Sequence, residues 1–128
     1  MKKALIHIIG PFCLVFSSLA ITSVASAHHS FAIYDFGTQV PFKGTVRTLN
    51  FRNPHITMTL THVDDEGQEH IINFVEGAPA NMAVRAGLKP EMIKVGTSLT
   101  VVGSPMKTDS DKYFIRQIIL DSGEEWKW

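Results

Sequence analysis

A chain of 128 residues with 12 basic and 12 acidic side chains is long enough for one folded domain and has no excess of positive charge. Its lysines and arginines are spread along the sequence, which argues against a nucleic-acid-binding protein, since such proteins cluster basic residues to neutralise phosphates. The single cysteine, Cys13, excludes an intramolecular disulfide and a thiolate metal site.

The first 27 residues have the pattern of a secretory signal peptide. Two lysines follow the initial methionine, residues 8–24 are mainly apolar, and Ala25-Ser26-Ala27 ends the segment with the small residues that signal peptidase accepts. We therefore expect cleavage between Ala27 and His28, and a periplasmic or secreted protein. The alternative is an uncleaved membrane anchor, but the apolar stretch of about 17 residues is shorter than the ~20 that span a bilayer, and a Gly-Pro pair interrupts it.

Removal of the signal peptide leaves 101 residues with five histidines, no cysteine and a formal net charge of −2. A chain of this length can bury enough apolar surface for one stable core without cross-links. We divide it into an N-terminal arm, residues 28–39, and a β-domain, residues 40–128. No membrane span is expected after cleavage.

Alternation of apolar and polar residues predicts strands at residues 40–51, 55–63 and 69–76. Gly44, inside the first strand, indicates a bulge or a sharp bend, because glycine in a strand often marks such a position. Residues 64–67, which end in a glycine, have the composition of a hairpin turn between the second and third strands.

A short helix is predicted at residues 80–86, ended by Gly87, with one more helical turn at residues 90–93. Two further strands are predicted at residues 98–103 and 113–120. Residues 80–120 are therefore predicted to form one helical connection followed by a pair of strands.

Three strands, a short helix and two more strands is the element order of an OB-type barrel. We predict a mainly β fold: a five-stranded, OB-like, partly open barrel with a short helix between strands three and four. A simple open α+β meander is the competing architecture.

Several short blocks of the mature chain form a recognisable series. They are His28-His29-Ser30-Phe31-Ala32 with Tyr34-Asp35-Phe36, Lys43-Gly44-Thr45-Val46, Asn53-Pro54-His55, Glu76-Gly77-Ala78-Pro79 with Arg85-Ala86-Gly87, Gly96 and Gly103-Ser104-Pro105. In these blocks the chain resembles the DUF6152 family of small secreted bacterial proteins of unknown function. Phe74 and Leu88 stand where tryptophan is common in that pattern. The resemblance implies export and a common fold, but no activity.

The histidines are the residues that point most directly to chemistry. If His28 is the first residue after cleavage, its α-amino nitrogen and its imidazole can chelate one metal ion, and a second imidazole completes a three-nitrogen set suited to Cu(II). His29 offers a different chelate through the amine, an amide nitrogen and its imidazole. The second imidazole we expect is His55, which follows a proline at a strand start, with Glu76 orienting an imidazole without binding the metal.

Each of these residues also has a plain structural interpretation. The two N-terminal histidines can be a solvated chain end, His55 an exposed strand residue, and Glu76 an ion-pair partner of Arg85. His62 and His70 flank the predicted hairpin and can form a separate surface pair, or His62 can cap the core. Copper is thus the one cofactor that the sequence suggests, and its binding is a hypothesis.

No nucleophile elbow, phosphate loop or zinc-protease helix occurs, so we do not expect an enzyme. The alternative to metal binding is a non-catalytic interaction module that binds a peptide, a glycan or a small ligand, or an envelope protein, on the barrel face. A purely structural role in the envelope is the third possibility. The residues expected on the binding face are Arg47, Arg52, Thr57 and Thr59.

Overall fold

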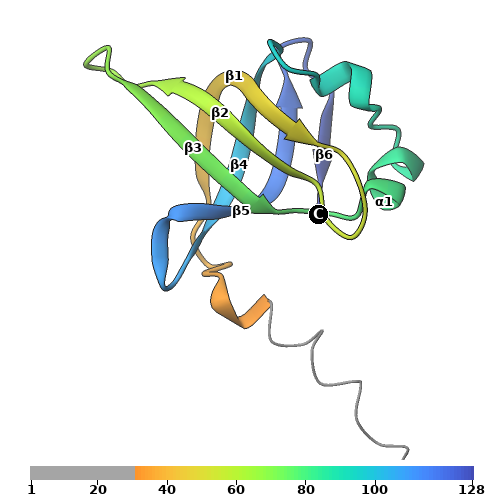
Figure 1. Ribbon diagram of the computed structural model, residues 1–128, viewed down its shortest axis with the longest axis horizontal. Coiled ribbons are helices and arrows are strands. Elements are labelled where there is room, and N and C mark those ends of the chain that lie inside the picture. The colour runs from red at the N-terminus through yellow and green to blue at the C-terminus, as the bar shows by residue number, and fades with distance from the viewer. Residues whose placement is uncertain (1–30) are drawn as a thin grey trace, which may run out of the picture.

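The structure is a computed structural model that describes residues 31–128 (Figure 1). The predicted signal peptide, His28, His29 and Ser30 lie outside the described residues. The elements, in chain order, are the 3₁₀ turn η1 (Phe31–Ile33), β1 (Val40–Asn50), β2 (Thr57–Val63), β3 (Glu69–Glu76), α1 (Ala80–Arg85), the 3₁₀ turn η2 (Pro90–Ile93), β4 (Ser98–Met106), β5 (Asp109–Leu120) and β6 (Glu125–Lys127). No helix within residues 31–128 is long and apolar enough to cross a membrane.

Strands β1 to β5 form a barrel, which confirms the predicted mainly β, OB-like fold, although the barrel is closed rather than partly open. The strand order is β3-β2-β1-β4-β5-β6, and β3 also pairs with β5, so the sheet returns on itself. The closing pair is parallel, with Phe74 opposite Tyr113, whereas the other strand pairs are antiparallel. The closing pair covers the hydrogen-bonding edge of β3 from Asn73 to Glu76. The competing open meander is therefore wrong.

Gly44 permits the closest approach of β1 and β2, but the bulge lies elsewhere. A Cβ atom at this position would be 2.4 Å from the backbone oxygen of Thr61, so only glycine fits. The pairing of β1 with β2 slips by one residue between Val46 and Thr48, which places the bulge at Arg47. We expected the bulge or bend at Gly44, and the structure has the bulge three residues later, at Arg47.

The second half of the barrel has longer strands than the sequence pattern predicts. Strand β4 continues beyond Gly103 to Met106, and β5 begins at Asp109 rather than at Tyr113. The extension crosses Pro105, two residues beyond the predicted end of the strand. Its carbonyl oxygen still accepts a hydrogen bond, from the backbone N–H of Asp35 at 2.9 Å. A short strand that was not predicted, β6, pairs with β5.

The core fills the barrel and continues under the helical connection. Leu88 and Ile93, on either side of the turn that follows α1, are fully buried. The indole N–H of Trp126 in β6 donates to the backbone oxygen of Ala86 at 3.0 Å, which ties the C-terminal strand to the end of α1. The other large buried core side chains are Val46, Ile56, Met58, Leu60, Phe74, Leu99, Val101, Ile115 and Ile118.

Candidate functional site

The arm before β1 is attached to the β4–β5 hairpin by three backbone-directed hydrogen bonds. The N–H of Asp35 donates to the oxygen of Pro105 at 2.9 Å, and the N–H of Lys107 donates to the oxygen of Ile33 at 2.8 Å. The ammonium group of Lys107 donates to the oxygen of Ala32 at 2.9 Å. These bonds fix the start of the described chain beneath the barrel, where Figure 1 shows it in orange.

Aromatic packing fixes the arm on the first half of β5. The rings of Phe31, Tyr34 and Phe36 lie with their centroids 5.8, 5.4 and 5.3 Å from that of Phe114. The guanidinium carbon of Arg116 lies 5.0 Å from the centroid of the Phe36 ring, a cation–π contact. Such edge-on and tilted aromatic contacts each stabilise by about 0.5–1.5 kcal/mol beyond area burial, so the arm is well anchored.

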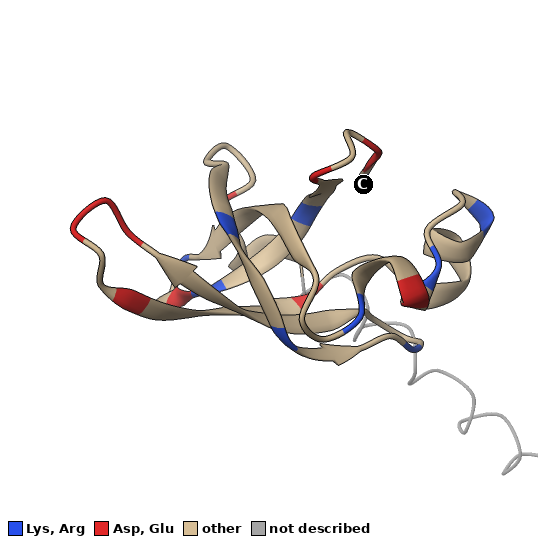
Figure 2. Ribbon diagram, turned by 90° about the horizontal axis from the view of Figure 1, so that it is seen from above, with Lys and Arg blue, Asp and Glu red and all other residues tan. Residues whose placement is uncertain are grey.

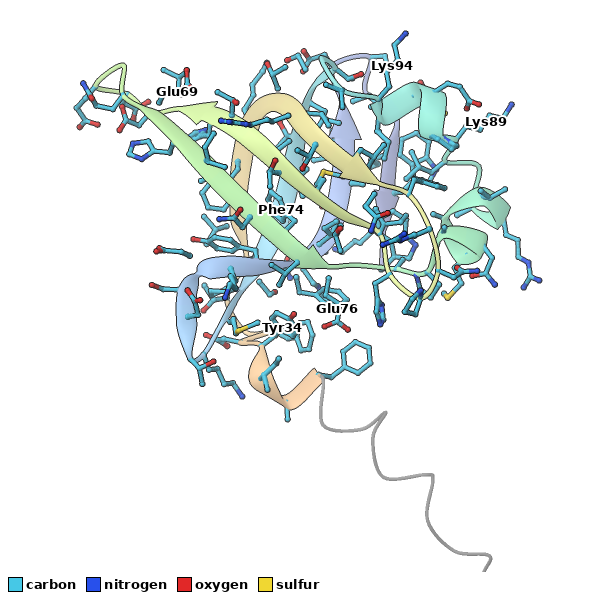
Figure 3. All side chains as sticks on the ribbon, in the orientation of Figure 1. Tyr34, Glu69, Phe74, Glu76, Lys89 and Lys94 are labelled. Atoms are coloured by element: carbon cyan, nitrogen blue, oxygen red, sulfur yellow. The ribbon has the colours of Figure 1, made fainter. Side chains whose placement is uncertain are left out.

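Tyr34 links the arm to a carboxylate at the end of β3 (Figure 3). Its hydroxyl donates to Oε2 of Glu76 at 3.0 Å. Tyr34 is 3% exposed and Glu76 is 9% exposed, so both ends of this bond are buried. Burial raises the pKa of Tyr34 far above its ordinary value, and the hydrogen bond and negative charge of Glu76 raise it further.

His55 approaches the same carboxylate from the loop between β1 and β2. Its Nδ1 lies 2.9 Å from the backbone oxygen of Gly77. A carbonyl oxygen can only accept, so Nδ1 carries the hydrogen, and in the neutral ring Nε2 holds the lone pair. Nε2 lies 3.5 Å from Oε1 of Glu76.

The gap between His55 and Glu76 is suited to a cation. A lone pair and a carboxylate oxygen repel each other unless a proton or a metal ion lies between them. Bonds of about 2.0–2.2 Å from one metal to an imidazole nitrogen and a carboxylate oxygen place those two atoms roughly 3–3.5 Å apart. The observed 3.5 Å therefore fits either an imidazolium–carboxylate ion pair or a shared metal ion.

The structure thus brings together two of the predicted site residues, His55 and Glu76, and adds Tyr34, which the sequence reasoning missed. The only available signal for Tyr34 was its place in the Tyr34-Asp35-Phe36 block after the N-terminal histidines. Arg85, our alternative partner for Glu76, is exposed on α1.

The four residues of the predicted binding face do not line one hollow. Thr57 and Thr59 line a shallow hollow of about 290 Å³ over β2 and β3. The hydroxyl oxygen of Thr59 lies 2.8 Å from that of Thr48 on β1. Arg47 and Arg52 are exposed but do not line this hollow.

A larger cavity of about 490 Å³ lies at the β2–β3 hairpin, with His62 and His70 in its wall. Across residues 31–128, no group of three or more histidine, cysteine, aspartate or glutamate side chains is arranged to hold a metal ion.

Replacing Tyr34 by phenylalanine is expected to lower the free energy of unfolding by about 1–3 kcal/mol, because a buried carboxylate loses a hydrogen-bond donor. The wild-type protein should also lose stability above pH ~10, since the raised pKa of Tyr34 means that folding opposes its deprotonation. Urea unfolding at about pH 8 and about pH 11 measures both effects, and the variant should lose less stability between these two pH values. Burial also raises the pKa of Tyr113, so the variant should still lose some stability at the higher pH. An equal loss in both proteins would contradict the role of Tyr34.

Comparison with protein families matches residues 16–113 to the family of unknown function DUF6152. No curated protein and no solved structure matches the chain. The matched stretch contains Tyr34, His55 and Glu76, together with His28-His29. Because the match covers most of the sequence, the chain belongs to the DUF6152 family.

Proposed function

We propose that this protein is an exported, non-catalytic metal-binding domain that holds Cu(II) between its N-terminus and the barrel. The ligands are the α-amino nitrogen and imidazole of His28 and the Nε2 of His55. Glu76 orients the His55 ring or shares the ion with it. His29 supplies the alternative chelate through the amine, an amide nitrogen and its own imidazole.

The orientation of the His55 ring is the observation that carries the proposal. Metal-binding histidines almost always donate their second ring N–H to a carbonyl or a carboxylate, which fixes the tautomer and the ring orientation. His55 does this through Nδ1 to Gly77 at 2.9 Å and keeps Nε2 beside Glu76. The carboxylate oxygen 3.5 Å from this remaining nitrogen favours a cation there, and the proposal takes that cation to be a metal ion rather than a proton.

Chain geometry supports the participation of His28. Phe31 is anchored on Phe114, and Phe114 stands opposite Glu76 in the β3–β5 pairing. His28 lies three positions before Phe31, and an extended chain spans at most about 3.6 Å per residue, so the reach is about 11 Å. The tether is therefore short, and it starts from a ring that packs on the residue opposite Glu76.

Export and cleavage after Ala27 are part of the proposal, because the chelate needs a free amine at His28. An α-amino group has an ordinary pKa near 8, so protons compete with the metal and binding should weaken on acidification. The predicted signal peptide, residues 1–27, provides the route to that processed form.

The test is a calorimetric Cu(II) titration of protein that begins at His28, with the terminus verified by intact mass. The matched control begins at Ala25, which moves the amine three residues away and leaves the barrel unchanged. We expect one tight site in the processed protein and an affinity at least about 100-fold weaker in the control. Equal affinities in the two proteins would refute the N-terminal chelate. If His29→Ala alone abolishes binding, the metal is held by the alternative chelate, which uses the amine, an amide nitrogen and the imidazole of His29.

A second candidate is supported by the hollow that Thr57 and Thr59 line, which spans two strands and has polar hydroxyl groups in its wall. Under this candidate the protein is an interaction module that binds a peptide, a glycan or a small ligand there. Thr59→Val would then abolish ligand binding, whereas His55→Ala would not. The metal hypothesis predicts the opposite pattern for copper.

A further inference from the structure

The inner face of the β2–β3 hairpin continues past the apolar core and ends in two imidazoles. Three pairs of directly opposite residues follow one another along this face. They are Met58–Phe74, Leu60–Ile72 and His62–His70. The first two pairs belong to the core or pack against it. Directly opposite residues have Cβ atoms about 4.5–5.5 Å apart, so the two imidazoles start close enough to converge on one ion.

The His62 ring is held by the backbone of the neighbouring strand. Its Nδ1 donates to the carbonyl oxygen of Lys43 at 2.7 Å, since that oxygen can only accept. Phe42 contacts the ring edge-on, with the two centroids 5.7 Å apart. Nε2 of the neutral ring therefore carries the lone pair.

The His70 ring is held by a carboxylate in the hairpin turn. Its Nε2 lies 2.6 Å from Oδ2 of Asp64 and donates to it. The hydrogen on Nε2 leaves the lone pair of the neutral His70 ring on Nδ1.

Both rings line the same cavity of about 490 Å³. Their centroids are 6.5 Å apart. Two imidazoles that bind one ion with bonds of about 2.0–2.1 Å have centroids roughly 4.5–6.5 Å apart, depending on the angle between the bonds. The observed separation lies at the wide end of that range, which corresponds to two nearly opposite metal–nitrogen bonds.

The charge around the pair favours a cation. Asp64 and Asp111 also line the cavity, and no lysine or arginine does. Figure 2 shows the acidic residues of the β2–β3 turn as the red loop at the left of the molecule. A divalent ion would therefore enter a region of negative potential.

We propose that His62 and His70 form a second transition-metal site, separate from the one at His55, for a divalent ion that imidazole binds well, such as Cu(II). The pair supplies two nitrogen ligands through Nε2 of His62 and Nδ1 of His70, and solvent completes the coordination. Lys43 and Asp64 play the part that carbonyls and carboxylates play behind metal-binding histidines. This site does not depend on signal cleavage or on the N-terminal amine.

The experiment is an NMR titration of the processed protein with Cu(II), which broadens the signals of nearby amides. The first equivalent should broaden signals around His55, and the second should broaden those of His62 and His70. If the N-terminal site does not exist, broadening at the hairpin will occur with the first equivalent. The two proposals therefore fail independently.

The double variant His62→Gln/His70→Gln should lose the broadening at the hairpin and keep that around His55, and dispersed amide signals will show that it folds. His55→Ala should show the reverse. In Asp64→Asn, the oxygen that accepts from the backbone of the turn is kept, but the oxygen that accepts the hydrogen bond of His70 is replaced by an amide nitrogen. This variant should bind Cu(II) at the hairpin about tenfold more weakly, or weaker still. The proposal is wrong if Cu(II) does not broaden the hairpin signals of the wild-type protein, or if the broadening survives in the double variant. The two histidines would then have a purely structural role.

Discussion

Replacing His55 by alanine is expected to weaken Cu(II) binding by the processed protein about 100-fold, with little effect on folding. The substitution removes the imidazole ligand that the barrel contributes to this site, and even residues that only orient a metal ligand change affinity by about 10–100-fold. The folded state loses one hydrogen bond to Gly77 from a half-buried ring, a cost of about 1 kcal/mol. Calorimetry gives the affinity, and urea unfolding gives the stability.

Two further variants make this result specific. Thr59→Val lies in the other hollow and should leave copper affinity unchanged. Glu76→Gln keeps the size of the side chain but removes its charge, and it should weaken binding by about tenfold. If His55→Ala binds copper as tightly as the wild type does, the N-terminal histidines bind without the barrel and the proposed site is wrong.

The largest loss of stability is expected from Gly44→Ala, about 3 kcal/mol or more. The added Cβ would be 2.4 Å from the backbone oxygen of Thr61 and 3.1 Å from its carbonyl carbon, so β1 and β2 must separate. Since a domain has only about 5–15 kcal/mol of net stability, this is a large fraction. The melting temperature should fall by roughly 12–24 °C for a domain of this size.

Gly67→Ala is the matched control. Gly67 has a φ of +80° in the hairpin turn, and nothing lies within 4 Å of a Cβ atom built there. Alanine at this position meets only the conformational cost of the left-handed region, about 1–2 kcal/mol. A loss at Gly44 no larger than at Gly67 would show that the strands relax without cost. Calorimetric melting of the two variants distinguishes these outcomes.

Much of the barrel could be predicted because its local patterns are strong. The alternation in β2 predicted that Met58 and Leu60 share a face, and both are buried. The glycine of the predicted hairpin turn has the positive φ that this turn needs. The short helix followed from its apolar side and from Gly87, which ends it with a φ of +93°.

Where the prediction was incomplete, a contact between distant segments had overridden a local signal. Pro105 normally marks the end of a strand, but β5 and the arm hold it inside β4. Strand β6 has three residues, too few for an alternating pattern, and its position depends on pairing with β5. The bulge or bend was predicted at Gly44, and the pairing of β1 with β2 places the bulge at Arg47.

The sequence by itself determined the first three strands, the turn between β2 and β3, the order of the five main strands and the short helix, and which histidines are available. Only the tertiary structure decided that Tyr34, His55 and Glu76 meet, and that His62 and His70 face each other beside Asp64. Tyr34 and Glu76 are 42 positions apart and come together because β3 pairs with β5 and the arm packs on β5. Periodicity specifies the face on which each side chain lies, whereas strand register and barrel closure specify its neighbours, and no local pattern contains them.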